Sequence, residues 1–129
     1  MKTLTKLKLT DTAIDKIKFD DLEFSYINKD GKNIFRDRIY IPFDVPKKSF
    51  LKGLNLCIHK SSGSMIFIVM FWYQKKSKVY SIGKYIPGSF GIRQVEEKLH
   101  QVHKAHTNDK GHWIKNPNET EAKERAEKE

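Results

Sequence analysis

The chain has 129 residues, a formal net charge of +9 and one cysteine. This length suits one domain, and a chain of this size can bury about two-thirds of its unfolded surface without cross-links. The lone Cys57 excludes an internal disulfide framework and predicts a reducing, cytoplasmic setting. The most apolar run, residues 65–73, is far shorter than the ~20 residues of a membrane-spanning helix, so no membrane partner is expected.

The positive charge is concentrated in one block of the chain. Residues 1–44 are nearly balanced in charge, whereas residues 45–95 contain no carboxylate at all. The basic residues of this block are Lys47, Lys48, Lys52, Lys60, Lys75, Lys76, Lys78, Lys84 and Arg93. A surface of one sign attracts a polyanion, which favours nucleic acid as the partner. The same composition also fits a lysine-rich soluble domain without such a partner.

The first predicted element is a short helix near the N-terminus. Thr10 or Asp11 can cap a helix that runs to about Ile17, because an oxygen-bearing side chain before an apolar step favours a helix start.

A β-hairpin is predicted next, over residues 22–41. Residues 22–27 and 39–41 alternate between apolar and polar side chains, and Asp30-Gly31 between them is a turn signal. The prolines that follow, at positions 42 and 46, predict a loop over 42–52.

The middle of the chain predicts a three-stranded antiparallel meander. Residues 54–59 alternate and form a first strand, which a turn at 61–63 connects to the next. Residues 64–73 are apolar on both faces and therefore predict the central strand. A turn over 74–77 then leads to a third strand, residues 78–82.

A helix over residues 90–106, capped by Ser89, is expected to cover this sheet. Its apolar residues recur at three- and four-residue steps and form one stripe. These residues are Ile92, Val95, Leu99 and Val102. Residues 117–129 favour helix by composition but have no apolar stripe, which predicts a charged tail or linker.

The predicted fold is therefore α+β. A three-stranded antiparallel β-sheet packs against a C-terminal α-helix, with an extra N-terminal hairpin and a short N-terminal helix. We expect one domain over residues 1–116 and a charged linker over 117–129.

Residue types that could carry chemistry do not form a site. His100, His103 and His106 recur at three-residue steps along the predicted helix, so they diverge around its axis and predict no metal site. Cys57 and His59 share a strand face, but no acidic residue of the block can orient the histidine. We expect no catalytic residues, no metal and no cofactor in this chain.

The exposed face of the meander remains as the candidate binding surface. Strand alternation places Asn55, Cys57 and His59 on this face, and the same face is expected to receive Met70 and Trp72. Lysines at such a surface can reach phosphates, while small polar side chains can contact base edges. The predicted DNA-binding residues are Asn55, His59, Lys60, Lys75, Lys76, Lys78, Ser81 and Lys84. An ordinary amphipathic sheet with a lysine-decorated wet face is the simpler interpretation.

Several short stretches follow one another in an order typical of a known family. They are Leu9-Thr10-Asp11-Thr12-Ala13-Ile14, Gly53-Leu54-Asn55-Leu56-Cys57-Ile58, Ser62-Gly63, Ser81-Ile82-Gly83-Lys84-Tyr85 with Pro87, Ser89-Phe90 and Asn116-Pro117. In this order the chain resembles the N-terminal arm-type DNA-binding domain of phage and genomic-island integrases, which belong to the tyrosine recombinase family. The resemblance covers residues 9–14 and 53–129.

The resemblance implies sequence-preferring binding of double-stranded DNA at arm-type sites during site-specific recombination. The sheet's exposed face would enter the major groove, with Asn55 and Cys57 pointing outward and Lys75, Lys76, Lys78 and Lys84 as DNA contacts. The implied partners are duplex DNA, other integrase protomers and host DNA-bending or excision factors. The recombinase's catalytic residues would lie in a later region of a longer protein, so this chain itself is not expected to be an enzyme.

Two alternatives remain at this point. Trp72, Tyr73 and Tyr80 could stack the bases of a single-stranded nucleic acid. Alternatively, an exposed apolar patch of Met70, Phe71 and Trp72 would make the chain a protein-interaction module.

Overall fold

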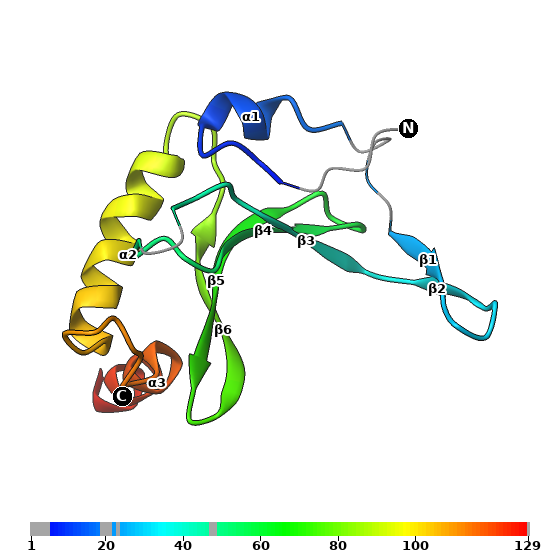
Figure 1. Ribbon diagram of the computed structural model, residues 1–129. Coiled ribbons are helices and arrows are strands. Elements are labelled where there is room, and N and C mark those ends of the chain that lie inside the picture. The colour runs from blue at the N-terminus through cyan, green and yellow to red at the C-terminus, as the bar shows by residue number, and fades with distance from the viewer. Residues whose placement is uncertain (1–5, 19–21, 23, 47–48, 129) are drawn as a thin grey trace.

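The computed structural model describes residues 6–18, 22, 24–46 and 49–128. A four-stranded antiparallel sheet lies at its centre, in the order β3-β4-β5-β6, with helix α2 along one face (Figure 1). The elements are β3 (Arg38–Pro42), β4 (Leu54–His59), β5 (Met65–Tyr73), β6 (Lys76–Lys84) and α2 (Ile92–His106). The predicted α+β class, with an antiparallel sheet and C-terminal helix, is confirmed.

Strands β4, β5 and β6 form the predicted meander, and β5 lies in the middle as its two apolar faces indicated. The turn over residues 61–63 is also confirmed, since Gly63 N–H donates to His59 O over 3.0 Å. Strand β6 is longer than expected because the preceding turn needs only Gln74 and Lys75. It therefore starts at Lys76 and continues past Gly83 to Lys84.

Residues 39–41 form a strand as predicted, β3, but its place as the fourth strand of the main sheet was not predicted. It pairs with β4, so that Ile39 lies opposite Ile58 and Ile41 opposite Leu56. The expectation that residues 39–41 pair back onto 22–27 is therefore wrong. Pairing with β4 buries Ile39 and Ile41 in the main core, which an isolated two-stranded hairpin could not do.

The N-terminal hairpin is smaller than predicted and forms its own two-stranded sheet. It pairs β1 (Ser25–Ile27) with β2 (Asn33–Phe35) and projects away from α2 (Figure 1). The predicted turn around residues 30–31 is confirmed. The Asn28 side-chain oxygen supports it by accepting from the backbone N–H groups of Asp30 and Lys32, each over 3.0 Å.

The core lies between the helices and one face of the sheet, called here the inner face. Val95 and Leu99 of the predicted stripe are fully buried on it. The short helix α1 (Asp11–Asp15) adds Ile14. Its predicted cap is confirmed, since Thr10 Oγ1 accepts from Ala13 N over 3.2 Å.

The start of α2 differs from the prediction. Ser89 does not cap the helix, because it belongs to the preceding turn, where its N–H donates to Ile86 O over 2.9 Å. The N-cap is Gly91, and the Asp11 carboxylate accepts from the N–H of Ile92 over 2.8 Å. An acidic side chain from α1 thus satisfies the helix start and complements its dipole.

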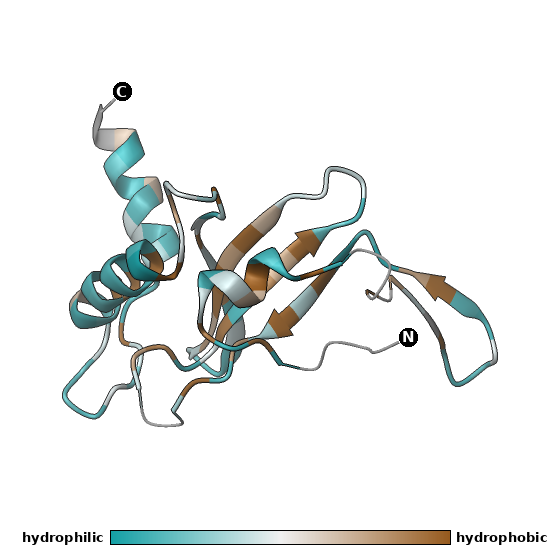
Figure 2. Cartoon of the chain, turned by 90° about the horizontal axis from the view of Figure 1, so that it is seen from above, coloured by the Kyte–Doolittle hydropathy of each residue, from teal (hydrophilic) through white to brown (hydrophobic). Residues whose placement is uncertain are grey.

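The predicted tail forms helix α3 (Pro117–Lys128), which is hydrophilic over most of its length (Figure 2). Its first turn is attached to β6: the Tyr80 hydroxyl donates to Glu121, and the Asn118 amide donates to Val79 O over 2.9 Å. No helix of the described part of the chain is long and apolar enough to cross a membrane.

Candidate nucleic-acid interface

The face of the sheet opposite the helices is the outer face, and its members follow from the strand register, because directly paired residues share a face. They are Arg38, Tyr40 and Pro42 of β3; Asn55, Cys57 and His59 of β4; Ile66, Ile68, Met70 and Trp72 of β5; and Ser77, Val79, Ser81 and Lys84 of β6. None of these described positions carries a carboxylate.

The middle of the outer face is closed to solvent. Asn55 is 8% exposed and Cys57 3%, since both lie in register between side chains of β3 and β5. The Asn55 amide donates to Gly53 O over 2.9 Å. The alternation that placed these side chains outward is confirmed, but their expected availability to a ligand is not.

The rim of the outer face is open. Ser81 and Lys84 are exposed, as predicted, and His59 is half-buried beside Arg38. Trp72 is 65% exposed. The predicted site residues that remain accessible therefore lie along the edges of this face.

Lys78 is placed differently from the prediction. It pairs with Phe71, so it lies on the inner side of the sheet, whereas Ser81 pairs with Ile68 on the outer side. The two are three residues apart on a strand, which puts them on opposite faces unless a bulge intervenes. The observed irregularity, opposite Phe67 and Ile68, comes after Ser81 and so does not bring them together.

Beyond β4 the sheet continues as a two-stranded ribbon. β4 pairs with β5 only as far as Val69, so residues 70–79 of β5 and β6 project past the other strands (Figure 1). We call this segment the tip ribbon. Gln74 and Lys75 turn the chain with φ of 50° and 64°, the left-handed pair that a two-residue hairpin turn of type I′ requires. Lys75 and Lys76 therefore stand, exposed, at its end, where Lys76 pairs with Tyr73 and so, like Lys78, lies on the inner side of the sheet.

Several carboxylates on the helix side of the molecule accept hydrogen bonds from neighbouring elements. Asp11 binds the start of α2, Glu121 accepts from Tyr80, and Asp15 accepts from the Tyr85 hydroxyl over 2.6 Å. This last bond raises the pKa of Tyr85 to about 12. Asp37 and Asp44 are exposed at the two ends of β3, next to Arg38 and two residues beyond Pro42. Between these ends, the outer face of the described sheet has basic side chains and no carboxylate.

Lys60 lies in the turn between β4 and β5, where its ammonium is 5.8 Å from the centre of the Phe35 ring. Its backbone N–H donates to Asp37 O over 2.8 Å. Because Lys60 is exposed, it extends the basic rim toward the N-terminal hairpin.

The histidines of α2 serve different purposes. His106 is buried and bridges Val102 O, at 2.7 Å, to Thr120 Oγ1, at 2.9 Å, and so joins α2 to α3. Burial, and secondarily the neighbouring His100, lowers the pKa of His103. Among the described residues no group of His, Cys, Asp or Glu is arranged to hold a metal ion.

Cys57 and His59 do touch, with Sγ 3.8 Å from Nε2. Burial nevertheless raises the pKa of the Cys57 thiol, and this effect exceeds the lowering by Arg38 and Tyr40. The thiol is therefore protonated at neutral pH, unlike an activated nucleophile.

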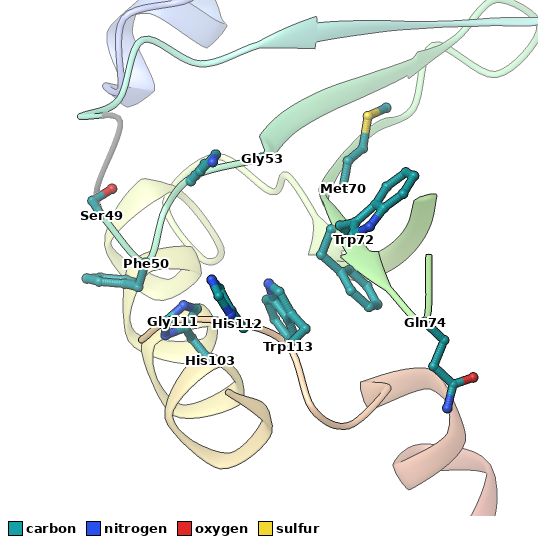
Figure 3. Close-up of a pocket in the computed structure, with 12 residues that line it drawn as sticks. Ser49, Phe50, Gly53, Met70, Trp72, Gln74, His103, Gly111, His112 and Trp113 are labelled. Carbon is teal, nitrogen blue, oxygen red and sulfur yellow. The ribbon is translucent and has the colours of Figure 1, made fainter. Parts of the chain in front are cut away.

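A cavity of about 540 Å³ opens beside the tip ribbon, and sequence reasoning did not find it (Figure 3). β5 contributes Met70 and Trp72, the loop before β4 contributes Phe50, and the segment after α2 contributes Trp113. These positions are far apart in the chain, so no local pattern joins them. No protein-family model, curated protein or solved structure matches this chain.

Proposed function

We propose that this chain binds duplex DNA through the outer face of its sheet and the tip ribbon, and does no chemistry on the DNA. The separation of charge carries the proposal. The outer face and the turns after β4 and β5 have basic side chains and no carboxylate, while Asp11, Asp15 and Glu121 are bonded on the helix side. A polyanion approaching this part of the molecule therefore meets favourable charge.

The tip ribbon supplies a shape that fits the groove. The major groove of B-form DNA is ~12 Å wide and admits a two-stranded β-ribbon. Lys75 and Lys76 at the turn would neutralise phosphates, while Ser77 on the outer face would reach base edges. Lys84 and Lys60 would contact the backbone on either side.

In a wider setting, we propose arm-type sites of site-specific recombination as the DNA target. The resemblance of residues 9–14 and 53–129 to integrase N-terminal domains supports this, as does a sheet packed against a C-terminal helix. Other integrase protomers and host DNA-bending or excision factors would then be the protein partners, in the cytoplasm.

Single-stranded nucleic acid is the second candidate, because Trp72 is 65% and Tyr40 42% exposed on an open sheet face. Aromatic side chains on such a surface can stack bases. Fluorescence anisotropy with a labelled duplex of two helical turns, and with each separated strand, distinguishes the two. We expect the duplex to bind more tightly. Tighter binding of the strands would favour the second candidate, and no binding of any of them at low salt would favour a protein-interaction module.

A further inference from the structure

The cavity beside the tip ribbon has aromatic walls. Phe71 and Trp113 pack with ring centres 4.5 Å apart, and Trp113 meets His103 edge-on at 5.5 Å. His103 in turn lies 6.4 Å from Phe50, so the rings form a continuous wall (Figure 3). At about 540 Å³ the cavity is within the ~300–1,000 Å³ range of small-ligand pockets.

One side of the cavity is a strand edge. Gly53 O accepts from Met70 N over 2.8 Å, and the β4–β5 ladder ends at the pair of Leu54 and Val69. Residues two apart on a strand direct their backbone groups to the same edge. The N–H and C=O of Trp72 therefore point away from β6, into the cavity.

Gly53 creates this opening. Its φ is +88°, and a Cβ there would lie 2.1 Å from Met70 O. The loop before β4 meets β5 at Gly53, where the pairing of β4 with β5 begins, and leaves the edge at Trp72 open. The cavity is thus built into the path of the loop before β4.

The charge around the cavity excludes some ligands and favours others. Its described lining contains Lys52 and no carboxylate, and Lys75 directly follows the lining residue Gln74. An aromatic cage for a cationic ligand would need carboxylates in place of these lysines. An aromatic group attached to an anion fits both the walls and the charge.

We propose that this cavity binds an unpaired nucleobase of the DNA on the outer face. Met70 and Trp72 belong both to the outer face and to the cavity lining, so a strand on that face reaches the entrance. The base would lie against the aromatic walls, and its hydrogen-bonding edge would pair with the N–H and C=O of Trp72. Lys52 and Lys75 would hold the adjoining phosphates. The ligand class thus rests on the proposed function.

The test compares a fully paired duplex with the same duplex carrying one extrahelical adenine. Stacking of one base is worth roughly tenfold in affinity, so we expect the bulged duplex to bind about that much more tightly. Both tryptophans of the chain line the cavity, so quenching of intrinsic fluorescence reports on it directly. Quenching should accompany the bulged duplex and exceed that with the paired one.

Trp72→Ala should remove the preference for the bulged duplex and leave the fold intact, because this side chain is largely exposed. Phe35→Ala is the matched control: Phe35 is 70% exposed on β2, outside the cavity, so the preference should persist. Equal affinity and equal quenching for the two duplexes would overturn the cavity proposal while leaving duplex binding intact.

Adenosine monophosphate separates the two proposals. Quenching by this nucleotide, with an affinity about tenfold weaker in Trp72→Ala, together with no binding of either duplex, would support the cavity and refute the outer-face function. An affinity that is unchanged in Trp72→Ala, followed through the fluorescence of Trp113, would place the nucleotide elsewhere and overturn the cavity proposal.

Discussion

Gly53 is the residue on which the shape of the candidate site depends most. Its left-handed backbone and the absent Cβ allow Gly53 O to accept from Met70 N, and the space beyond this contact is the cavity. Gly111 offers a matched comparison, because its φ is +80° but a Cβ there would meet nothing within 4 Å.

We expect Gly53→Ala to lower the free energy of unfolding by about 1–3 kcal/mol more than Gly111→Ala, because only Gly53 adds a steric clash to the backbone strain. Urea unfolding of both variants measures the difference. Equal losses would show that the loop can move away from β5 at no cost.

Arg38 is a second residue whose importance depends on the structure. It is exposed on the outer face opposite His59, at the edge of the sheet. An arginine can bond two acceptors of one guanine in the major groove, which a lysine does less specifically.

Arg38→Ala should therefore reduce discrimination between target and mismatched duplexes by roughly tenfold at one base step, in line with ~1–3 kcal/mol for a bidentate contact. Competition binding against a panel of singly substituted duplexes measures it. A uniform loss of affinity across the panel would assign Arg38 to phosphate contact instead.

From the sequence, the sheet face on which a side chain lies could be predicted better than its exposure to solvent. Alternation placed Asn55 and Cys57 on the outer face correctly, but their burial depends on β3, whose partner strand the sequence did not reveal. Because the pairing of β3 with β4 was not predicted, Arg38 was not recognised as a residue of the outer face. Lys78 and Ser81 were both expected on the DNA-binding surface, but the register irregularity follows Ser81, so the two lie on opposite faces.

At the scale of elements, α1 and α2 are held together by one carboxylate. Asp11 accepts from the N–H of Ile92, across 81 positions of sequence. Such a cap is invisible to local sequence patterns, which indicated Ser89 instead. The helix stripe, in contrast, was predictable, because burial of Val95 and Leu99 follows from their spacing alone.

We expect Asp11→Ala to lower the free energy of unfolding by about 1 kcal/mol, the usual value of a lost N-terminal cap. Asp11→Asn keeps a side-chain oxygen at the same place and should retain most of the stability. Urea unfolding of the two variants checks this. An equal loss in both would mean that charge, and not the acceptor oxygen, stabilises the start of α2.

At the scale of the whole molecule, the outer face of the sheet lacks carboxylates, whereas Asp11, Asp15 and Glu121 lie on the helix side. The sequence located the basic block in residues 45–95 and predicted the meander that carries it. Which side of the sheet receives the acids could not be predicted, because Asp11, Asp15 and Glu121 come from the two ends of the chain. The cavity could not be predicted from the sequence for the same reason, because three segments that are distant in the chain form it.

We propose that duplex DNA binds at the basic outer side through phosphate neutralisation. The most direct test is the salt dependence of duplex affinity for the wild type, Lys84→Ala and Lys104→Ala. Lys84 is exposed on the outer face, whereas Lys104 is an exposed lysine of α2, so its loss changes net charge equally without touching the outer side. We expect a log-log slope of roughly −4 to −5 for the wild type, smaller by about 1 in Lys84→Ala and unchanged in Lys104→Ala. A flat salt dependence, or equal effects of the two substitutions, would contradict the claim.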